Sequence, residues 1–285
     1  MKNQTQVGRT NKIRIALIFG ILVLILYLGF NQSFKITTYS IKSDKNIHNF
    51  RIVFVSDLHL KEYGKDNKIL LNTIKKLNPD IIAIGGDSVI YDVDSYDSAI
   101  NFINGAAKIA PTYFALGNHE WSEIYHNNSY ELLNALKGSD ACYLENDLVE
   151  VELDGNKIVV CGIIDNFNAL HDLTDGILKQ FNSEEYSEDF KLLLSHRPIT
   201  IKYTDIKPKA DLVLSGHEHG GQVIIPFTTQ GLYSRNQGWF PKYTSGMHTI
   251  ADNLVIISTG LSNSNHLVPR VNNRPELVVI DVNRE

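Results

Sequence analysis

The chain has 285 residues, of which 43% are hydrophobic, which is enough to build a sizeable folded core. Its formal net charge is −5 at neutral pH, and no long basic run follows the first segment, so nucleic acid is not an expected partner. Two cysteines, Cys142 and Cys161, are too few for a disulfide framework, which leaves either one disulfide or two free thiols.

The N-terminal segment has the composition of a membrane anchor. Residues 15–30 contain no charged side chain, and four basic residues precede them: Lys2, Arg9, Lys12 and Arg14. A helix needs about 20 residues to cross the hydrocarbon core, and roughly 17 can suffice, so we expect one transmembrane helix at 13–30. A cleaved signal peptide is the alternative, but the run is longer than a usual signal-peptide core and no small-residue cleavage site follows it.

The basic residues before this segment predict its orientation. The positive-inside rule keeps residues 1–12 in the cytoplasm and places the chain after residue 30 on the other side. We therefore expect a single-pass protein of the cell membrane whose main domain is extracytoplasmic. Residues 31–48 suit a tether with a possible first strand in "FKITTYSIK", followed by a domain at 49–285.

Short apolar runs alternate with amphipathic segments in the rest of the chain. Runs such as "RIVFVSDLH", "DIIAIGGDS" and "ADLVLSGHEH" end abruptly in polar residues, which is typical of strands buried on both faces. The segment between the first two runs predicts a helix that ends at Asn78-Pro79. Its apolar stripe consists of Ile69, Leu70, Thr73, Ile74 and Leu77. With further helices in "SAINFINGAAK" and "SYELLNALKG", the chain reads as one α/β domain without internal repeats.

Five of the apolar runs end in side chains that can bind a metal. These are Asp57 and His59, then Asp87, then Asn118 and His119, then His196, and finally His217 and His219. Ligand sites of open α/β folds lie at the carboxyl ends of strands. Oxygen and nitrogen donors without sulfur suit Mn, Fe or Zn. Either closely spaced pair alone is more often a surface accident or a polar turn. A buried cluster from five strand ends favours a metal, because unpaired buried carboxylates and imidazoles would otherwise be costly.

The spacing of two residues within each pair predicts how the side chains point. In an extended segment, residues two apart face the same side. Asp57 and His59 would then enter one pocket together, as would His217 and His219, whereas Glu218 would point away.

These blocks resemble, in the same order, those of the calcineurin-like metallophosphoesterases: "DLH", "GGDS", "GNHE", "LLSHRP" and "SGHEHGG". The following "NLVIISTGLSNSNHLVPRVNNRPELVVI" is similar to the bacterial membrane-anchored branch, some of whose members act on UDP-2,3-diacylglucosamine. The resemblance implies an α/β fold built as a four-layer αββα sandwich of two mixed sheets.

The resemblance also implies two divalent metal ions bridged by Asp87. One ion would bind Asp57, His59 and His219, and the other would bind Asn118, His196 and His217. A hydroxide between the ions would attack the phosphorus in line with the leaving oxygen. His119 would protonate that oxygen without binding a metal, and capping of the following helix is its alternative role.

Other residues are weaker candidates for substrate contacts: Asp165, Asn166, Arg197 and Arg270. Turn capping or surface exposure would explain the first three equally well. Arg270 and Arg274 could hold a phosphate or pair with a carboxylate such as Glu276. The aromatic-rich insert "FTTQGLYSRNQGWFPKYTSGMH" suits a lipid-facing or substrate-capping loop, or ordinary packing.

We therefore expect a membrane-anchored, binuclear metal-dependent phosphohydrolase that cleaves a phosphodiester or diphosphate in a phosphorylated small molecule or lipid. A nucleotide-sugar lipid, as for lipid A-type UDP-sugar diphosphatases, is one candidate, and another envelope molecule fits an outward-facing domain better. The same metals would also support a phosphomonoesterase or protein phosphatase. A metal-stabilised binding protein without turnover is the non-enzymatic alternative.

Overall fold

The computed structural model describes residues 33–91, 93–164, 170–265 and 268–285, together with Arg14, Leu17, Phe19 and Gly20. Within these parts of the chain, no helix has the length and apolar character needed to span a bilayer. The anchor expected at 13–30 lies almost entirely outside the described residues, so it stays a prediction.

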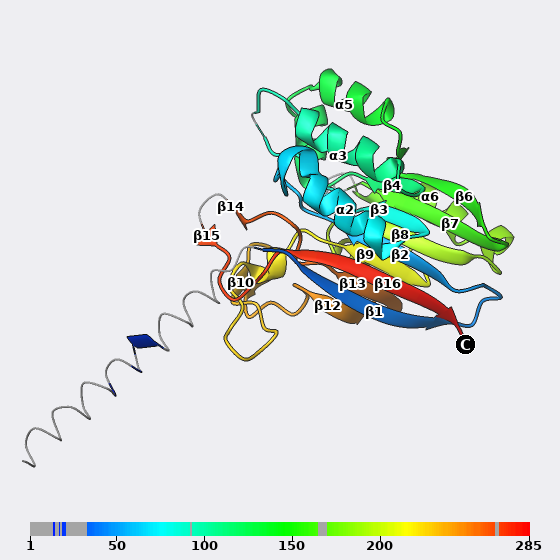
Figure 1. Cartoon of the computed structure of the whole chain (residues 1–285). Coiled ribbons are helices and arrows are strands. Elements are labelled where there is room, and N and C mark those ends of the chain that lie inside the picture. Colours follow the sequence, from blue (N-terminus) through cyan, green and yellow to red (C-terminus); the bar gives the residue numbers. More distant parts are fainter. Residues whose placement is uncertain are drawn as a thin grey trace, which may run out of the picture.

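Two six-stranded mixed sheets form the centre of the fold (Figure 1). The first has the order β1-β16-β2-β3-β4-β5 and contains β1 (Lys35–Ser43), β16 (Glu276–Arg284), β2 (Phe50–Val55), β3 (Ile81–Ile84), β4 (Thr112–Ala115) and β5 (Cys142–Leu144). The second has the order β12-β13-β9-β8-β7-β6 and contains β12 (Gly246–Ile250), β13 (Asn253–Ile257), β9 (Leu212–Ser215), β8 (Phe190–Ser195), β7 (Asn156–Ile163) and β6 (Asp147–Leu153). This confirms the prediction of two mixed sheets.

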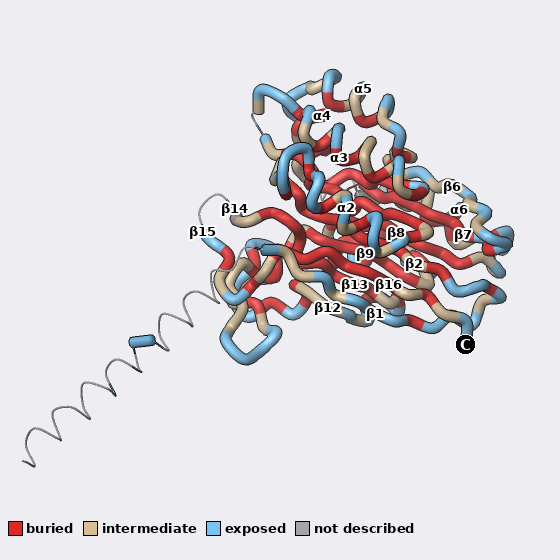
Figure 2. Tube along the Cα trace, viewed as in Figure 1, coloured by how far each residue is buried: buried red, intermediate tan, exposed pale blue. Residues whose placement is uncertain are grey.

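The two sheets pack face to face through one apolar layer. Ile52 and Phe54 of the first sheet lie in the same buried cluster as Leu192 and Leu194 of the second. The central strands are accordingly buried along most of their length (Figure 2). Each sheet therefore buries one face in this layer, and its outer apolar face must be buried against another layer of structure.

Helices supply that outer cover. Four lie over the first sheet: α2 (Lys68–Leu77), α3 (Asp97–Ala107), α4 (Asn118–Tyr125) and α5 (Tyr130–Lys137). On the second sheet, α6 (Leu170–Phe181) buries Leu178 and Phe181. The order of layers is helix, sheet, sheet, helix.

The shorter elements are 3-10 helices and two-stranded pairs. The 3-10 helices are η1 (Lys65–Asn67), η2 (Glu184–Tyr186), η3 (Thr200–Lys202) and η4 (His219–Gly221). The short strands are β10 (Tyr233–Ser234) with β11 (Gly238–Trp239), and β14 (Ser264–Asn265) with β15 (Val268–Pro269).

The helix α2 buries a narrower stripe than its sequence predicts. Leu70 and Ile74 are fully buried, four residues apart on one face, whereas Ile69 is 58% exposed, so its assignment to the stripe was wrong. Ile69 is rotated about 100° from Leu70 around the helix axis, which takes it off the face that contacts the sheet. The helix ends as predicted, because Asn78 adopts a left-handed conformation and its N–H bonds to Lys75 O.

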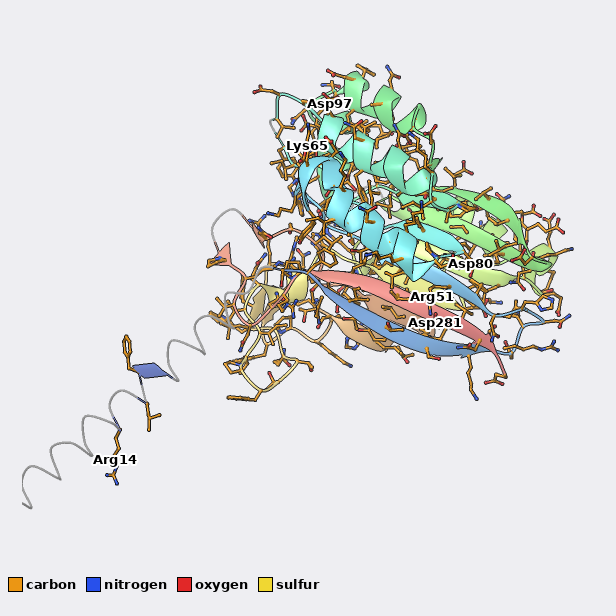
Figure 3. All side chains as sticks on the ribbon, viewed as in Figure 1. Arg14, Arg51, Lys65, Asp80, Asp97 and Asp281 are labelled. Atoms are coloured by element: carbon orange, nitrogen blue, oxygen red, sulfur yellow. The ribbon has the colours of Figure 1, made fainter. Side chains whose placement is uncertain are left out.

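The segment "FKITTYSIK" contributes a full strand to the first sheet. It forms β1, which runs parallel to β16, with Lys35 opposite Glu276. On the other side of β16, Arg51 of β2 pairs with Asp281 at 2.7 Å and also donates to Leu77 O at the end of α2 (Figure 3). The sheet therefore begins well before residue 49.

Candidate metal centre

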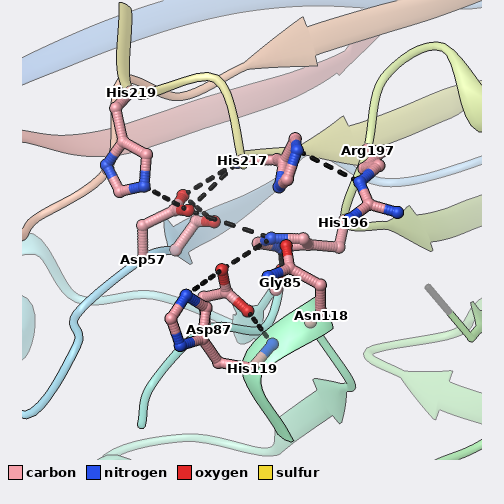
Figure 4. A network of polar contacts seen from close by, with 12 residues as sticks. Asp57, Gly85, Asp87, Asn118, His119, His196, Arg197, His217 and His219 are labelled. Carbon is pink, nitrogen blue, oxygen red and sulfur yellow. Dashed lines mark hydrogen bonds and ion pairs between the residues drawn. The ribbon is translucent and has the colours of Figure 1, made fainter. Parts of the chain in front are cut away.

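All five predicted strand ends meet at one end of the sandwich. Asp57 and His59 follow β2, Asp87 follows β3, and Asn118 and His119 begin α4 directly after β4. His196 follows β8, and His217 and His219 follow β9. Because β2, β3 and β4 are parallel neighbours, as are β8 and β9, their carboxyl ends bring these side chains into one cluster (Figure 4).

The paired residues reach this cluster through turns and not through extended strands. Asp57, His59, His217 and His219 all have positive φ, between 46° and 72°. The alternation argument for these pairs was therefore wrong, since each strand ends before its first ligand. The left-handed turns are held by the neighbouring loop, as Asp57 N donates to Gly86 O and His59 N to Asp87 O.

Asp57 and Asp87 are the buried carboxylates around which the imidazoles gather. His219 Nε2 lies 3.4 Å from Asp57 Oδ1, and His196 Nε2 lies 3.1 Å from Asp87 Oδ2. His59 Nε2 lies between the two carboxylates, 3.9 Å from Asp57 Oδ1 and 3.7 Å from Asp87 Oδ2. His59 and His196 thus lie within 4 Å of both carboxylates, whereas His219 lies near Asp57.

Backbone carbonyls orient two of the imidazoles. His196 Nδ1 lies 2.7 Å from Gly85 O, and His59 Nδ1 lies 3.2 Å from Val89 O. Because a carbonyl oxygen only accepts, each Nδ1 carries the proton and donates it. The unprotonated Nε2 of each neutral ring therefore faces the carboxylates, which is the tautomer that a metal ligand needs.

The environment of the cluster favours neutral imidazoles beside an ionised carboxylate. Burial lowers the pKa of His59 to about 3, and it lowers the pKa of His219 well below its ordinary value. Burial alone would raise the pKa of Asp87, but the neighbouring His196 and His119 hold it well below its usual range. Burial raises the pKa of Asp57 to about 6. At neutral pH both carboxylates can therefore bind a cation without competing with imidazolium groups.

The donor set fits a divalent metal centre. Three groups have ligand atoms within 4.8 Å of one another: Asp57, His59 and His219; His59, Asp87 and His119; and Asp87, His196 and His217. Asn118 Oδ1 is buried and has no hydrogen-bond partner among the residues that the structure describes. An amide oxygen next to carboxylates and imidazoles is a ligand type that Mn, Fe or Zn accepts.

Two glycines make room for the carboxylates. A Cβ on Gly117 would lie 2.2 Å from Asp87 Oδ1, and a Cβ on Gly216 would lie 2.3 Å from Asp57 Oδ2. Any side chain at either residue would displace a carboxylate, so the close approach of the loops requires glycine.

Comparison with known proteins identifies the family. A family profile described as calcineurin-like phosphoesterase matches residues 50–221, the part of the chain that carries the whole cluster. The chain belongs to this family. The phosphoesterase is 25% identical to phosphodiesterase YaeI of Escherichia coli over 238 residues, with 82% of each chain covered. It is 26% identical over 226 residues to UDP-2,3-diacylglucosamine pyrophosphatase LpxG of Chlamydia muridarum, covering 65% of this chain and 68% of LpxG.

A solved structure shares the fold of this phosphoesterase. The 5'-nucleotidase precursor from Thermus thermophilus aligns with a TM-score of 0.50 and 14% identity, over 75% of this chain and 50% of that protein. Not all relatives match over their full length, since this chain spans 54% and 58% of two curated bacterial metallophosphoesterases.

Glu120 has a structural role in this phosphoesterase that the sequence did not reveal. Its buried carboxylate accepts hydrogen bonds from the backbone N–H groups of Asp87, Ser88, Val89 and Gly117, at 2.6–3.1 Å. Burial, and then the charge of Asp87, raise the pKa of Glu120 to about 7. The residue ties the loop that carries Asp87 to the helix that carries Asn118. It was visible in "GNHE", but nothing in that block shows which amides the side chain binds.

Two further residues near the cluster carry no recognisable signal in the sequence. The Tyr91 ring stacks on His119 with centroids 3.8 Å apart, and its hydroxyl accepts from Asn118 Nδ2. Asn236 Nδ2, which comes from the aromatic insert, lies 2.6 Å from His217 Nε2. Both depend on how long loops fold back onto the site, which local pattern does not specify.

Two of the weaker candidates for substrate contacts, Arg197 and Arg270, contact histidines of the cluster, and the other two lie outside the described residues. Arg197 Nε lies 3.1 Å from His217 Nε2. Arg270 is fully buried, with its guanidinium donating to Thr259 O and lying 3.3 Å from His219 Nδ1, so the expected substrate contact at Arg270 was wrong. Asp165 and Asn166 fall outside the described residues.

Glu218 belongs to none of the three ligand groups, although it lies between His217 and His219 and lines the cavity over the cluster. Its carboxylate is hydrogen-bonded to the Ser234 hydroxyl, which lies in the aromatic insert. This contact connects the loop between His217 and His219 to a surface segment.

Separate replacements of Glu218 and His217 should distinguish a residue that only holds the loop in place from a residue that binds metal. Glu218→Gln keeps an oxygen acceptor for Ser234, so we expect turnover within about threefold of the unchanged protein. His217→Ala removes a ligand, so its activity should fall by more than the roughly 100-fold that loss of a supporting group costs. Steady-state hydrolysis at saturating metal measures both variants, and equal losses would contradict these assignments.

Replacing Glu120 should loosen the metal-binding loops. Glu120→Gln removes the charge and turns one acceptor into an N–H group that faces backbone donors, so the free energy of unfolding should fall by about 2–3 kcal/mol. Metal affinity should fall by roughly 10- to 100-fold. Denaturant titration and metal titration measure these effects. Glu123→Gln is the control, because that buried carboxylate contacts only Tyr96 and Asn127 in the described chain and should leave metal affinity unchanged.

Proposed function

We propose that the protein is a membrane-anchored phosphohydrolase with a binuclear metal centre, and that it cleaves a phosphodiester or diphosphate. The observation that carries this proposal is the meeting of five strand ends in two ligand groups on either side of Asp87. Asp57, His59 and His219 form one group, and His196 and His217 form the other together with Asp87. Asn118 Oδ1 is buried and without a hydrogen-bond partner among the described residues, so it would add an oxygen ligand to the second group.

The chemistry of the centre suits phosphoryl transfer to water. Two divalent cations, when bound, would neutralise the phosphate oxygens and lower the pKa of a water aligned for attack. Asp87 would hold the cations together with His196 and His59, because one of its oxygens accepts from His119 N at 2.8 Å and the other faces these two imidazoles. Asn118 is neutral, so it adds a ligand without adding repulsion toward an anionic substrate.

His119 is the best-placed proton donor for the leaving oxygen. It lines the cavity, and its Nε2 lies 4.0 Å from Asp87 Oδ2, at the edge of the ligand cluster. The Tyr91 ring on one face and the His59 ring edge-on restrict its orientation. An imidazole fixed beside the ligands can deliver a proton without occupying a ligand position.

The cavity over the cluster favours a substrate with bulk on both sides of the phosphorus. It has a volume of about 800 Å³ and extends from the ligands past Ile90, Val223 and Leu232, with Lys61 and Arg235 also in its wall. Mixed apolar and basic lining suits an anionic, amphipathic diester or diphosphate. The names of YaeI, a phosphodiesterase, and LpxG, a pyrophosphatase of a UDP-diacylglucosamine, support this substrate class.

Metal-dependent hydrolysis by the full-length chain in detergent tests the proposed function. After chelation and reloading with Mn, Fe or Zn, bis-p-nitrophenyl phosphate should be cleaved faster than p-nitrophenyl phosphate. Asp87→Asn should lower kcat by more than roughly 100-fold. His119→Ala should lower kcat by about 10²- to 10⁴-fold for a diester with an unactivated alcohol as leaving group, and by less for bis-p-nitrophenyl phosphate, because nitrophenolate leaves without a proton.

The control variant is His48→Ala, because His48 is exposed and lies outside the cluster. Faster monoester cleavage would favour a phosphomonoesterase or protein phosphatase. Absence of any metal-dependent cleavage, or an Asp87→Asn variant as active as the unchanged protein, would leave a metal-stabilised binding protein as the better description.

We further propose that the catalytic domain lies outside the cytoplasm. The four basic residues before the apolar segment support this orientation. In intact cells, a C-terminal tag should react with an impermeant reagent, and an N-terminal tag should be protected. Changing Lys2, Arg9, Lys12 and Arg14 to Gln should weaken this asymmetry. A protected C-terminal tag in the unchanged protein would show that the orientation is wrong.

A further inference from the structure

The insert that follows the metal ligands exposes an unusual number of aromatic side chains. We call residues 222–243 the aromatic loop; it contains the β10–β11 hairpin. Phe227 is fully exposed, Trp239 is 68% exposed and Phe240 is 61% exposed, and Tyr233 packs beside Trp239 with ring centroids 5.4 Å apart. Single exposed apolar residues are ordinary, but several on one loop indicate a surface that contacts something apolar.

The charged side chains of the aromatic loop are all basic. The sequence between Glu218 and Asp252 contains no acidic residue, whereas Arg235 and Lys242 are basic and exposed. Tyrosine and tryptophan beside basic residues are the composition that proteins place at the interface between a bilayer and water. A partner surface of apolar and anionic character is therefore complementary to the loop.

The aromatic loop is hydrogen-bonded, through the segment 271–274, to the start of the continuously described chain at Ser33. Val223 bridges to Val271, and Ile224 N donates to Val271 O. Three residues further on, Arg274 donates to Ser33 O and Phe34 O. Figure 1 shows β10 and the start of β1 at the same end of the molecule, opposite the C-terminus.

The apolar N-terminal segment ends close to this point. Ser33 follows residue 30, the last of the uncharged run, by only three residues. Three residues span at most about 11 Å. If that run lies in a membrane, Ser33 and the aromatic loop near it must lie at the membrane surface.

The loop is also part of the cavity wall. Tyr233, Arg235 and Trp239 line the cavity over the metal ligands, and Asn236 contacts His217. The exposed aromatic surface is therefore continuous with the opening of the candidate active site.

We propose that the aromatic loop docks on the surface of the lipid bilayer that holds the N-terminal segment. Phe227, Trp239 and Phe240 enter the interfacial layer, and Arg235 and Lys242 lie near anionic headgroups. The inference rests on the membrane anchoring stated under Proposed function. It adds a second, reversible contact, which turns the opening of the cavity toward the lipid surface.

The two tryptophans of the chain provide a direct test. Trp239 lies in the loop, whereas Trp121 lies on α4 and packs partly buried against the core of the first sheet. Full-length Trp121→Phe and Trp239→Phe variants each retain a single tryptophan, whose fluorescence can be measured separately. They are reconstituted into vesicles of phosphatidylcholine and phosphatidylglycerol, with or without lipids brominated near the carboxyl end of their chains.

Bromine should quench the emission of Trp239 by roughly twofold or more and should leave Trp121 nearly unchanged, because interfacial tryptophans lie at headgroup level. Adding Phe240→Ser to the Trp121→Phe variant should reduce the quenching. Adding Tyr130→Ser, an exposed aromatic on α5, should not.

The outcomes separate the docking proposal from the anchoring proposal. Protein that floats with the vesicles but shows no quenching of Trp239 would overturn docking and leave anchoring intact. A blue-shifted Trp239 emission without quenching would indicate a second protein copy on the loop, and would also overturn docking. Protein that does not float with the vesicles would overturn both.

Discussion

The burial of Asp57 and Asp87 is the constraint on which this structure depends. Both carboxylates are almost completely inaccessible, and they lie where the ends of the two sheets meet. Removing two negative charges from water costs several kcal/mol each unless opposite charge compensates for it. Neutral imidazoles and a few backbone amides provide only part of that compensation. The folded state is therefore stabilised by any divalent cation that binds there, and folding and metal binding become linked.

The loops around the cluster follow from the same constraint. Oxygens and nitrogens from separate strands reach one centre only through sharp turns, which explains the left-handed conformations of Asp57 and His217. Such conformations cost about 1–3 kcal/mol each and persist only where the surroundings hold them. The Asp57 carboxylate accepts hydrogen bonds from His217 N. The Glu120 carboxylate accepts from backbone amides of the loop that carries Asp87. Ligands from one sheet thus help to fix the backbone that carries ligands from the other.

Much of this arrangement could be predicted from the sequence, because it depends on local pattern. Buried strands appear as apolar runs, and the ligands follow where each run stops, so the strands and the cluster were anticipated. What failed depends on three-dimensional context. The direction of His59 is set by a turn that no periodicity encodes. Arg270 was expected to hold a phosphate or pair with a carboxylate, but the fold buries it next to His219. Asn236 reaches His217 from a loop whose course only the complete fold determines.

The position of β16 has a consequence for how the protein is made. This last strand lies between β1 and β2, the first two strands of the chain. During synthesis the first sheet stays open along that gap until β16 has been made, and β1 has no other neighbour in the sheet before then. The ligands that follow β2 therefore cannot rest on a complete first sheet until Glu276–Arg284 is available for pairing. Completion of the sheet beneath the centre is a late event in folding.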